Sequence, residues 1–340
     1  TSGTTGKPKG CLHSHRGVTL AAMNAALVAS IAYGDRLLMA MPIWHSSPLN
    51  NWFGGTLYVG GTIVLLREYH PLRFLQTVQD ERITVYFGAP VSYFAPVQHV
   101  PNFASYDLSS VKAWIYGGGP IGTDMACMLA QAYKSDRFYQ VYGMTESGPL
   151  GTVLYPHEQV GKAGSIGRLA TPGIDVRVVA ADGSDARPGD IGEIWLRGDT
   201  VMRGYLADDA ATSAVFASGG WYRSGDLARV DEDSYLFIAD QTKDMIVTGG
   251  ENVYSKEVED VLMTHPAVAD VAVVGRPHPE WGETVVAHVV LKPQAEADGE
   301  ALSSFLADKL ARYKIPRDYQ IAASLPRTPT GKLQKYLLRA

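Results

Sequence analysis

The most informative stretch of the sequence is Thr1-Ser2-Gly3-Thr4-Thr5-Gly6-Lys7-Pro8-Lys9-Gly10. It combines three glycines, four hydroxyl side chains and two lysines. Glycine reaches backbone angles that are closed to other residues, so successive amide N–H groups can point into one concavity. Such a concavity binds anions, and the hydroxyls and lysines add donors and positive charge. The stretch predicts a loop that holds a polyphosphate, with a flexible polar tail as the alternative.

The P-loop of nucleotide-binding proteins is the obvious comparison, and the spacing excludes it. A P-loop needs two glycines separated by four residues, followed by Lys and then Ser or Thr. Here only two residues separate Gly3 from Gly6, and Pro8 follows Lys7. Proline lacks an N–H and disfavours a helical conformation of the preceding residue, so a helix cannot begin at Lys7.

Length and composition predict a globular protein with more than one domain. The 340 residues suffice for two domains, and 46% hydrophobic and 19% charged residues are ordinary values. The net charge of -5 argues against general nucleic-acid binding. With only Cys11 and Cys127, we expect no disulfide framework, which fits a reducing cytoplasm. The uncharged segment 17–34 is weakly apolar, and we expect a buried helix there rather than a membrane span.

Strands and helices alternate over the first half of the sequence. This alternation predicts a parallel sheet covered by helices, with ligands at the carboxyl ends of its strands. Gly117-Gly118-Gly119 and the stretch after Tyr142 lie at two such ends. The expected strands are 36–41, 62–66, 83–88, 111–116 and 137–142, and the expected helices are 72–81 and 125–133.

Two changes of pattern follow. From about residue 164, short strands separated by turn signals predict a β-rich region. From residue 245, a helix over 256–263 with Ser255 as its N-cap, two strands and an amphipathic helix predict an α+β unit. The predicted fold class is therefore α/β and α+β, with a small, mobile C-terminal domain. The predicted domains are 1–163, 164–240 and 241–340.

The order of residues 1–10 resembles the phosphate loop of the adenylate-forming enzymes, which include acyl-CoA synthetases, luciferases and peptide-synthetase adenylation domains. Four further stretches resemble motifs of that superfamily in the same order, so the resemblance spans the whole sequence. They are Tyr142-Gly143-Met144-Thr145-Glu146, Tyr222-Arg223-Ser224-Gly225-Asp226-Leu227, the stretch 240–252 and the stretch 325–333.

The resemblance implies a phosphate and metal site. Thr145 would contact phosphate, and Glu146 would hold Mg²⁺, which takes one or two carboxylates plus phosphate oxygens. Taken alone, Glu146 is equally compatible with a solvated carboxylate, the commonest fate of a glutamate.

The implied nucleotide site draws on several stretches. Asp226 would accept hydrogen bonds from the ribose hydroxyls, although a lone Ser-Gly-Asp is usually a turn. Gln241 stands where the family usually has arginine, so the positive charge and its forked geometry are lost. The implied ATP- and AMP-binding residues are Thr1, Ser2, Gly3, Thr4, Thr5, Gly6, Lys7, Gly117, Gly118, Gly119, Tyr139, Gln140, Tyr142, Gly143, Asp226 and Gln241.

The resemblance also assigns a hinge and a catalytic lysine. Lys243 stands at the family's pivot, and Gly249 and Gly250 would let the pantetheine arm of CoA approach the backbone. Lys332 would stabilise the negative charge that builds up when a carboxylate attacks the α-phosphate. Without the surrounding motif, Lys332 would be interpreted as an ordinary solvated lysine.

The acid is expected to bind in an apolar pocket. In the family, an aromatic-His pair after a proline borders the carboxylate, and Trp44 and His45 fit that pattern. Ser47 and Gly118 would line the same pocket. Further side chains expected there are Ser46, Leu49, Trp52 and Phe53.

The implied function is that of an ATP-dependent acid-CoA ligase with ATP, Mg²⁺ and CoA. A carboxylic acid would be adenylated to acyl-AMP, and the thioester with CoA would follow. A fatty acid is the favoured substrate and an aryl acid the alternative; no nucleic-acid partner is expected, and a homo-oligomer stays open. Because the family's N-terminal subdomain is absent before Thr1, the alternative of another class is a truncated or non-catalytic nucleotide-binding fragment.

Overall fold

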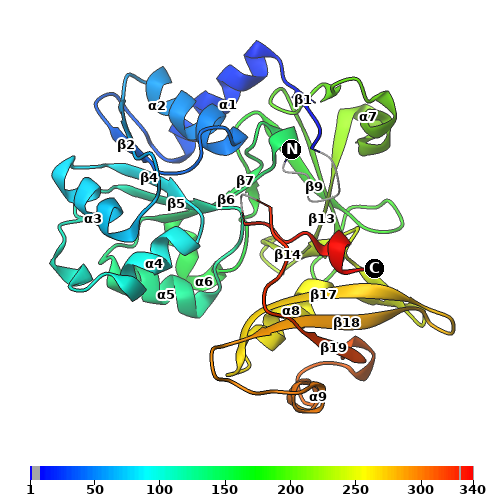
Figure 1. Ribbon diagram of the computed structural model, residues 1–340. Coiled ribbons are helices and arrows are strands. Elements are labelled where there is room, and N and C mark those ends of the chain that lie inside the picture. The colour runs from blue at the N-terminus through cyan, green and yellow to red at the C-terminus, as the bar shows by residue number, and fades with distance from the viewer. Residues whose placement is uncertain (2–7, 329–330, 340) are drawn as a thin grey trace. The chain divides into compact units, whose positions relative to one another are not determined.

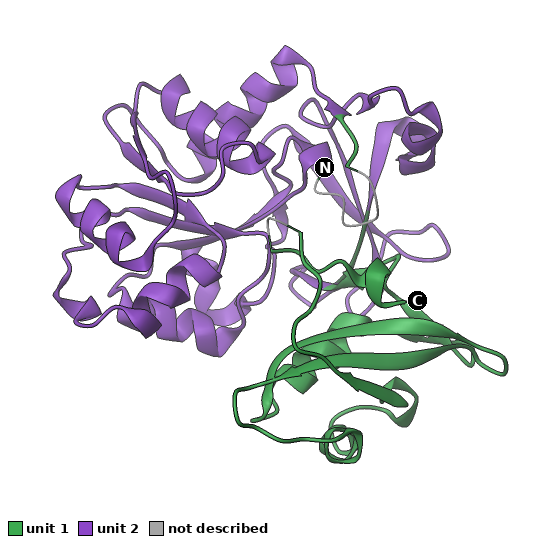
Figure 2. Ribbon diagram, viewed as in Figure 1, with its two compact units in different colours: residues 1–10, 225–228, 239–340 green, residues 11–224, 229–238 purple. Residues whose placement is uncertain are grey.

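The computed structural model describes residues 1, 8–328 and 331–339. These residues divide into two compact units (Figure 2). The large unit comprises residues 11–224 and 229–238, and the small unit comprises residues 1–10, 225–228 and 239–340. The three-domain division expected from the sequence, with boundaries after residues 163 and 240, remains a prediction.

A seven-stranded sheet in the order β3-β2-β4-β5-β6-β7-β8 forms the centre of the large unit. The first five strands are parallel, as predicted, whereas β7 and β8, for which no strands were predicted, are antiparallel to their neighbours. Only residues 143–151 connect β6 to β7, too few for the crossover that a parallel pair needs. The strands are β2 Arg36–Met39, β3 Thr62–Leu65, β4 Val85–Gly88, β5 Ala113–Gly117, β6 Phe138–Tyr142, β7 Thr152–Leu154 and β8 Leu169–Ala170.

Helices cover both faces of this sheet (Figure 1). Alternate residues of one strand face opposite sides, so Tyr86 packs beneath α3 and α4 whereas Val85 packs beneath α1. A π-helix, η1, runs from Ser47 to Phe53, a stretch for which no helix was predicted from the sequence. The helices are α1 His15–Val28, α2 Gly54–Tyr58, α3 Pro71–Asp80, α4 Val91–His99, α5 Thr123–Ala132 and α6 Gln159–Lys162.

The β-rich part of the chain forms a second sheet in the order β12-β13-β10-β9, with β14 paired to β13. A short helix, α7, interrupts it, which the sequence did not predict; the carboxylate of Asp208 caps α7 by accepting from the N–H of Ala211. The elements are β9 Ile174–Val179, β10 Ile191–Gly198, α7 Asp209–Val215, β12 Phe216–Ala217, β13 Trp221–Val230 and β14 Leu236–Gln241. A separate antiparallel pair is formed by β1 Cys11–Leu12 and β11 Gly204–Tyr205.

The small unit is an α+β structure. Its sheet has the order β16-β15-β18-β17, with β19 parallel to β18, and the buried leucines of α8 and α9 pack on it. The elements are β15 Ile246–Thr248, β16 Glu251–Val253, α8 Ser255–Met263, β17 Val268–His278, β18 Gly282–Leu291, α9 Gly299–Ala307 and β19 Asp318–Ile321. The predicted mixed fold class is confirmed.

Of two predictions about helices, the one for Ser255 is wrong and the one for segment 17–34 agrees with the structure. Ser255 is not the N-cap of α8: Tyr254 holds that position, and the buried Ser255 hydroxyl donates to Asp240 instead. Segment 17–34 was expected to be a buried helix, and α1 covers most of it. Within the described residues, no helix combines the length and apolar character needed to cross a membrane.

Candidate nucleotide and acid site

The predicted glycine run lies at the carboxyl end of β5, beside the carboxyl end of β6. Gly117 closes β5 and Tyr142 closes β6, and the two strands are parallel neighbours. Gly118 has a φ of +85°, a backbone conformation that residues with a side chain rarely adopt. Within the described residues, a Cβ added to Gly118 or Gly119 would meet no heavy atom within 4 Å. The backbone after β5 therefore has a conformation that suits glycine at Gly118, and the space beside Gly118 and Gly119 is open.

The three residues of β6 that are predicted to bind the nucleotide differ in exposure. Gln140 is 2% exposed, and its Oε1 has no hydrogen-bond partner among the described residues. Tyr142 is also buried. Tyr139 is half-buried; burial raises the pKa of its hydroxyl, and its ring lies 6.2 Å from that of Tyr155. Tyr139 is thus the most accessible of the three side chains.

Thr145 begins a short 3-10 helix, Thr145–Ser147, directly after β6. The turn into it requires Gly143, because a Cβ there would lie 2.2 Å from the carbonyl oxygen of Pro149. His13 Nε2 lies 2.8 Å from the carbonyl oxygen of Thr145, and Ser46 Oγ lies 3.1 Å from Thr145 Oγ1. Segments far apart in the sequence therefore position this threonine.

Glu146 is held from the β11 segment. The hydroxyl of Tyr205 donates to Glu146 Oε1 at 3.0 Å, and the N–H of Met202 donates to the Glu146 carbonyl at 2.8 Å. Burial, reinforced by the neighbouring carboxylate, raises the pKa of Tyr205 far above its usual value. Tyr205 consequently stays protonated and orients the Glu146 carboxylate.

A metal at Glu146 would need ligands besides protein carboxylates. The described residues contain no group of three or more His, Cys, Asp or Glu side chains that could hold a metal ion. Glu146 and Thr145 offer hard oxygen atoms, the ligand type that Mg²⁺ prefers, and Mg²⁺ commonly completes its shell with phosphate oxygens and water. The donor set fits a nucleotide-bound Mg²⁺.

Most of the predicted acid-pocket residues precede η1 or belong to it. The Trp44 side chain is 65% exposed, and its ring centroid lies 6.4 Å from that of His45. The N–H of Ser47 lies 3.4 Å from His45 Nδ1. Trp52 is fully buried and stacks on Phe87 with centroids 5.2 Å apart. Trp52 thus packs in the core while Trp44 faces outward.

In the small unit, the structure brings together two residues of the predicted nucleotide site. Gln241 Nε2 donates to Asp226 Oδ1 at 2.8 Å, and the N–H of Thr242 donates to the Gly225 carbonyl at 2.8 Å. Asp226 lies within β13, so the Ser-Gly-Asp stretch belongs to a strand rather than to a turn between strands. Gln241 therefore donates to the Asp226 carboxylate, the group that is predicted to contact the ribose.

The predicted hinge residues belong to two turns. Burial lowers the pKa of Lys243, and the Arg339 guanidinium donates to the Lys243 carbonyl at 2.7 Å. Gly249 and Gly250 form the two-residue turn between β15 and β16, both with positive φ, as type I′ hairpins require. The N–H of Gly249 donates to the carbonyl of Trp281 at 2.9 Å.

Lys332 lies next to an antiparallel bridge between Arg327 and Leu333. The N–H of Thr328 donates to the Lys332 carbonyl at 2.8 Å, and the Lys332 side chain is exposed. The Arg327 guanidinium donates to the Gly331 carbonyl and to Asp270, both at 2.7 Å. The backbone that carries Lys332 is therefore fixed although its side chain reaches solvent.

Residues Ser2 to Lys7 of the predicted phosphate loop lie outside the described residues. The flanking residues contact each other: the amino group of Thr1 donates to the Lys9 carbonyl at 2.7 Å, and the N–H of Lys9 donates to Thr1 Oγ1 at 2.9 Å.

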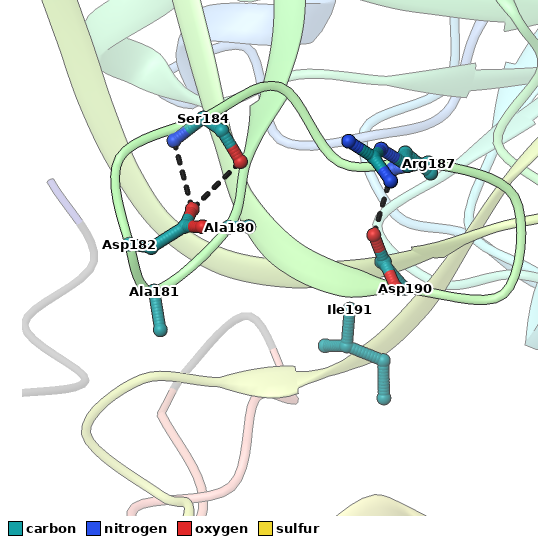
Figure 3. A pocket seen from close by; sticks show the side chains of 7 residues that line it. All are labelled: Ala180, Ala181, Asp182, Ser184, Arg187, Asp190 and Ile191. Carbon is teal, nitrogen blue, oxygen red and sulfur yellow. Dashed lines mark hydrogen bonds between the residues drawn. The ribbon is translucent and has the colours of Figure 1, made fainter.

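A surface hollow of about 510 Å³ is lined by none of the predicted site residues (Figure 3). It is formed by the turn between β9 and β10. Its polar groups bond to one another: Ser184 donates to Asp182, and the N–H of Arg187 donates to Asp190. The hollow is a feature of this turn and adds nothing to the candidate site.

Sequence reasoning missed two contributors to the site. His13 contacts Thr145, but no pattern around His13 marks it as a site residue. Tyr205 contacts Glu146, but it was not among the predicted site residues. A buried tyrosine needs a hydrogen-bond partner, and that is the only signal that pointed toward Tyr205.

Two family models match the sequence. The model of the AMP-binding enzymes matches residues 1–206, and the model of the AMP-binding enzyme C-terminal domain matches residues 257–332. The chain belongs to the AMP-binding enzyme family. The resemblance to the adenylate-forming enzymes is thereby confirmed.

Individual family members are similar along the whole chain. Feruloyl-CoA synthase from an Amycolatopsis species is 39% identical, covering 98% of this chain and 67% of its own length. Long-chain-fatty-acid–CoA ligase FadD13 from Mycobacterium tuberculosis is 36% identical, covering 100% and 66%. The solved structure of o-succinylbenzoate CoA synthetase from Bacillus subtilis with ATP and magnesium has a TM-score of 0.88 at 30% identity, covering 99% and 68%. The chain spans about two thirds of the length of these relatives.

Proposed function

We propose that this chain carries the catalytic residues of an AMP-forming acid-CoA ligase. The observation that carries the proposal is the pair Thr145 and Glu146, held at the carboxyl end of β6 beside the glycine end of β5. Such strand ends are where ligands bind in open α/β sheets. Family members named as CoA ligases, acting on different acids, support the reaction class.

In the proposed reaction, a carboxylate oxygen of the acid attacks the α-phosphorus of ATP, and the bond to the β-phosphate breaks. Acyl-AMP forms and pyrophosphate leaves. The thiol sulfur of CoA, having lost its proton, then attacks the acyl carbon, and AMP leaves as the thioester forms.

The residues divide this work. Thr145 would donate to phosphate, Asp226 would accept from the ribose, and Lys332 would offset the charge on the α-phosphate. Mg²⁺ bound at Glu146 would neutralise the phosphates. His45, with Trp44, would border the acid. A cytoplasmic location is part of the proposal, because ATP and CoA are both used there.

Acid-dependent exchange of pyrophosphate into ATP tests the first half of the reaction. We expect exchange with at least one member of a panel of alkyl and aryl acids, and we expect Lys332→Ala to lower its rate by about 10²–10³-fold. Lys256→Ala is the matched control, because Lys256 is another lysine of the small unit and pairs with Asp260 on the surface. Measurable ATP binding without exchange for any acid would support a nucleotide-binding protein without turnover.

A further inference from the structure

Ser46 immediately precedes the π-helix η1 but does not cap it. A serine at the N-cap of a helix usually accepts a hydrogen bond from a backbone N–H of the first turn. Ser46 holds that position before Ser47–Phe53, yet among the described residues its side chain makes no capping hydrogen bond. Its hydroxyl oxygen lies instead 3.1 Å from Thr145 Oγ1, 99 residues away in the sequence. The Ser46 hydroxyl therefore joins two distant segments rather than stabilising its own helix.

The backbone around Thr145 is held by separate contacts. His13 Nε2 lies 2.8 Å from the Thr145 carbonyl oxygen. Met144 and Ser147 close the turn on either side, since the N–H of Met144 donates to Ser147 Oγ at 3.1 Å and the N–H of Ser147 donates to the Met144 carbonyl at 2.9 Å. Because these bonds fix the backbone, the contact with Ser46 acts on the direction in which the Thr145 hydroxyl points.

The two hydroxyl groups share one hydrogen bond, and either of them can be its donor. The oxygens of an ionised phosphate accept hydrogen bonds and do not donate them. A Thr145 hydroxyl that donates to phosphate must therefore accept from Ser46. A bound phosphate selects the arrangement in which Ser46 donates to Thr145 and Thr145 donates to phosphate. Two hydrogen bonds in such a chain polarise and strengthen each other.

The same contact links the turn of the proposed acid site to the proposed phosphate site. Ser46 directly follows His45, the residue that the proposed function assigns to the acid. The N–H of His45 donates to the Pro42 carbonyl at 3.1 Å, and the His45 carbonyl accepts from the N–H of Leu49 at 3.2 Å. An acid bound against His45 restrains this turn, and the Ser46 hydroxyl passes the restraint to Thr145.

We propose that Ser46 is a positioning residue of the ligase reaction. It directs the Thr145 hydroxyl toward the phosphate, and it thereby makes the acid and the nucleotide bind cooperatively. This inference rests on the proposed function and adds a link between its two substrates. Since a coupling free energy is reciprocal, each substrate should raise the affinity for the other by the same factor.

The first test measures acid-dependent pyrophosphate exchange. Ser46→Ala should lower kcat/KM for MgATP by about 5- to 10-fold, and Ser46→Thr, which keeps the hydroxyl, should retain most of it. In a Thr145→Val background no hydroxyl is left to direct, so Ser46→Ala should have no further effect. Ser110→Ala is the matched control. Its hydroxyl donates to the Ile83 carbonyl at 2.8 Å, before the amino ends of β4 and β5, and its loss should leave kcat/KM unchanged.

The second test needs no turnover. It uses α,β-methylene-ATP, in which the bond that breaks during adenylation is replaced by a stable one. Calorimetry gives its Kd with Mg²⁺, alone and with decanoic acid or cinnamic acid. We expect at least one acid to lower this Kd by about 5-fold or more in the unsubstituted protein. In Ser46→Ala the same acid should change the Kd by less than about 2-fold, whereas Ser110→Ala should keep the full effect.

The outcomes keep the two proposals apart. An unchanged kcat/KM for Ser46→Ala, or a loss of the same size in the Thr145→Val background, would overturn the positioning role. Absence of exchange with every acid would reject the ligase reaction. If the Kd of α,β-methylene-ATP nevertheless depends on an acid and loses that dependence in Ser46→Ala, the coupling role is retained. A Kd that no acid changes, or an acid effect that survives Ser46→Ala, would reject the coupling.

Discussion

Buried carboxylates are held in opposite ways in the two compact units. In the large unit, burial alone would raise the pKa of Asp35, but hydrogen bonds from Lys112, Ala32 and Thr84 outweigh burial and lower it. Asp231 follows the same pattern: burial is outweighed by Lys162 and by backbone N–H groups, and its pKa is lowered.

In the small unit, burial prevails. It raises the pKa of Glu259 although Lys335 lies 2.7 Å away, and it raises the pKa of Asp240 although Ser255 and Gln241 donate to it. One buried lysine links these groups: Lys335 donates to Glu259 and to the Ser255 hydroxyl, and that hydroxyl donates to Asp240.

The two arrangements respond to pH with opposite signs. A lowered folded-state pKa contributes stability above the ordinary value, 3.8 for Asp35, and that stability is lost as the pH falls through the folded pKa. A raised pKa contributes stability below the ordinary value, 4.5 for Glu259, and that stability is lost as the pH rises through the folded pKa. With respect to these groups, acid weakens the large unit and favours the small one.

The largest expected effect comes from breaking the buried network of the small unit. Lys335→Met leaves Glu259 buried without its cation, since the two side chains are only 11% and 15% exposed. We expect a loss of about 3–5 kcal/mol in the free energy of unfolding of the small unit. Urea unfolding followed by the fluorescence of Trp281, the only tryptophan of residues 239–340, measures it.

Two variants complete that experiment. Lys256→Met removes a surface i,i+4 pair with Asp260 and should cost no more than about 0.5 kcal/mol. Combining Lys335→Met with Glu259→Leu should recover most of the loss, because replacing both members of a buried pair is often neutral. A cost of Lys335→Met equal to that of Lys256→Met would show that the network contributes no stability.

The next largest effect is expected at Asp35, the carboxylate of the large unit whose pKa is lowered. Asp35→Asn removes the charge that accepts from Ala32 at 2.7 Å and from Thr84 at 2.9 Å. We expect a cost of about 1–2 kcal/mol at pH 7 that shrinks as the pH falls below the ordinary value of 3.8 and Asp35 itself becomes protonated. Urea unfolding at pH 7 and in acid measures this difference.

Asp175→Asn provides the matched control for that measurement. Asp175 pairs with Arg197 on the surface, with both side chains about half exposed, so its removal should cost at most about 1 kcal/mol. A cost of Asp35→Asn that grows in acid would reverse the assigned sign.

A smaller effect is expected from removing the Tyr205 hydroxyl, the neutral donor that positions Glu146 in the large unit. Tyr205→Phe removes the hydroxyl that orients Glu146. Losing this hydrogen bond should cost about 1 kcal/mol in the binding of MgATP. The KM for MgATP should therefore rise by about 5-fold, with little change in kcat. Tyr69→Phe removes a hydroxyl of the same unit that donates to the Ser92 carbonyl, and it should leave this KM unchanged.

Sequence patterns predicted the parts of this site that are local. The apolar run before Gly117 and the one before Gly143 predicted two strands, and the rule for parallel sheets put their carboxyl ends together, as β5 and β6 confirm. Motif order likewise predicted the family.

The remaining features depend on contacts between distant segments. His13 and Thr145 are 132 residues apart, and Tyr205 and Glu146 are 59 apart, so no local period reveals either pair. Because serine is common at N-caps, the sequence predicted that role for Ser255. Its hydroxyl donates to the buried Asp240 instead. The π-helix η1 was missed because helix propensities do not distinguish it from a loop of similar composition.

The smallest expected effect concerns an exposed hydrogen bond of the small unit, between Gln241 and Asp226. Gln241→Arg adds a guanidinium beside this carboxylate, and an exposed ion pair of that kind changes stability by less than about 1 kcal/mol. Because the added charge would also attract the phosphates of a nucleotide whose ribose binds Asp226, we expect the KM for ATP to fall by about 2- to 5-fold. Gln294→Arg adds the same charge at an exposed position of the small unit and should leave this KM unchanged. A rise in KM for Gln241→Arg alone would mean that the arginine captures Asp226 and withdraws it from the ribose, so that the glutamine leaves the carboxylate available.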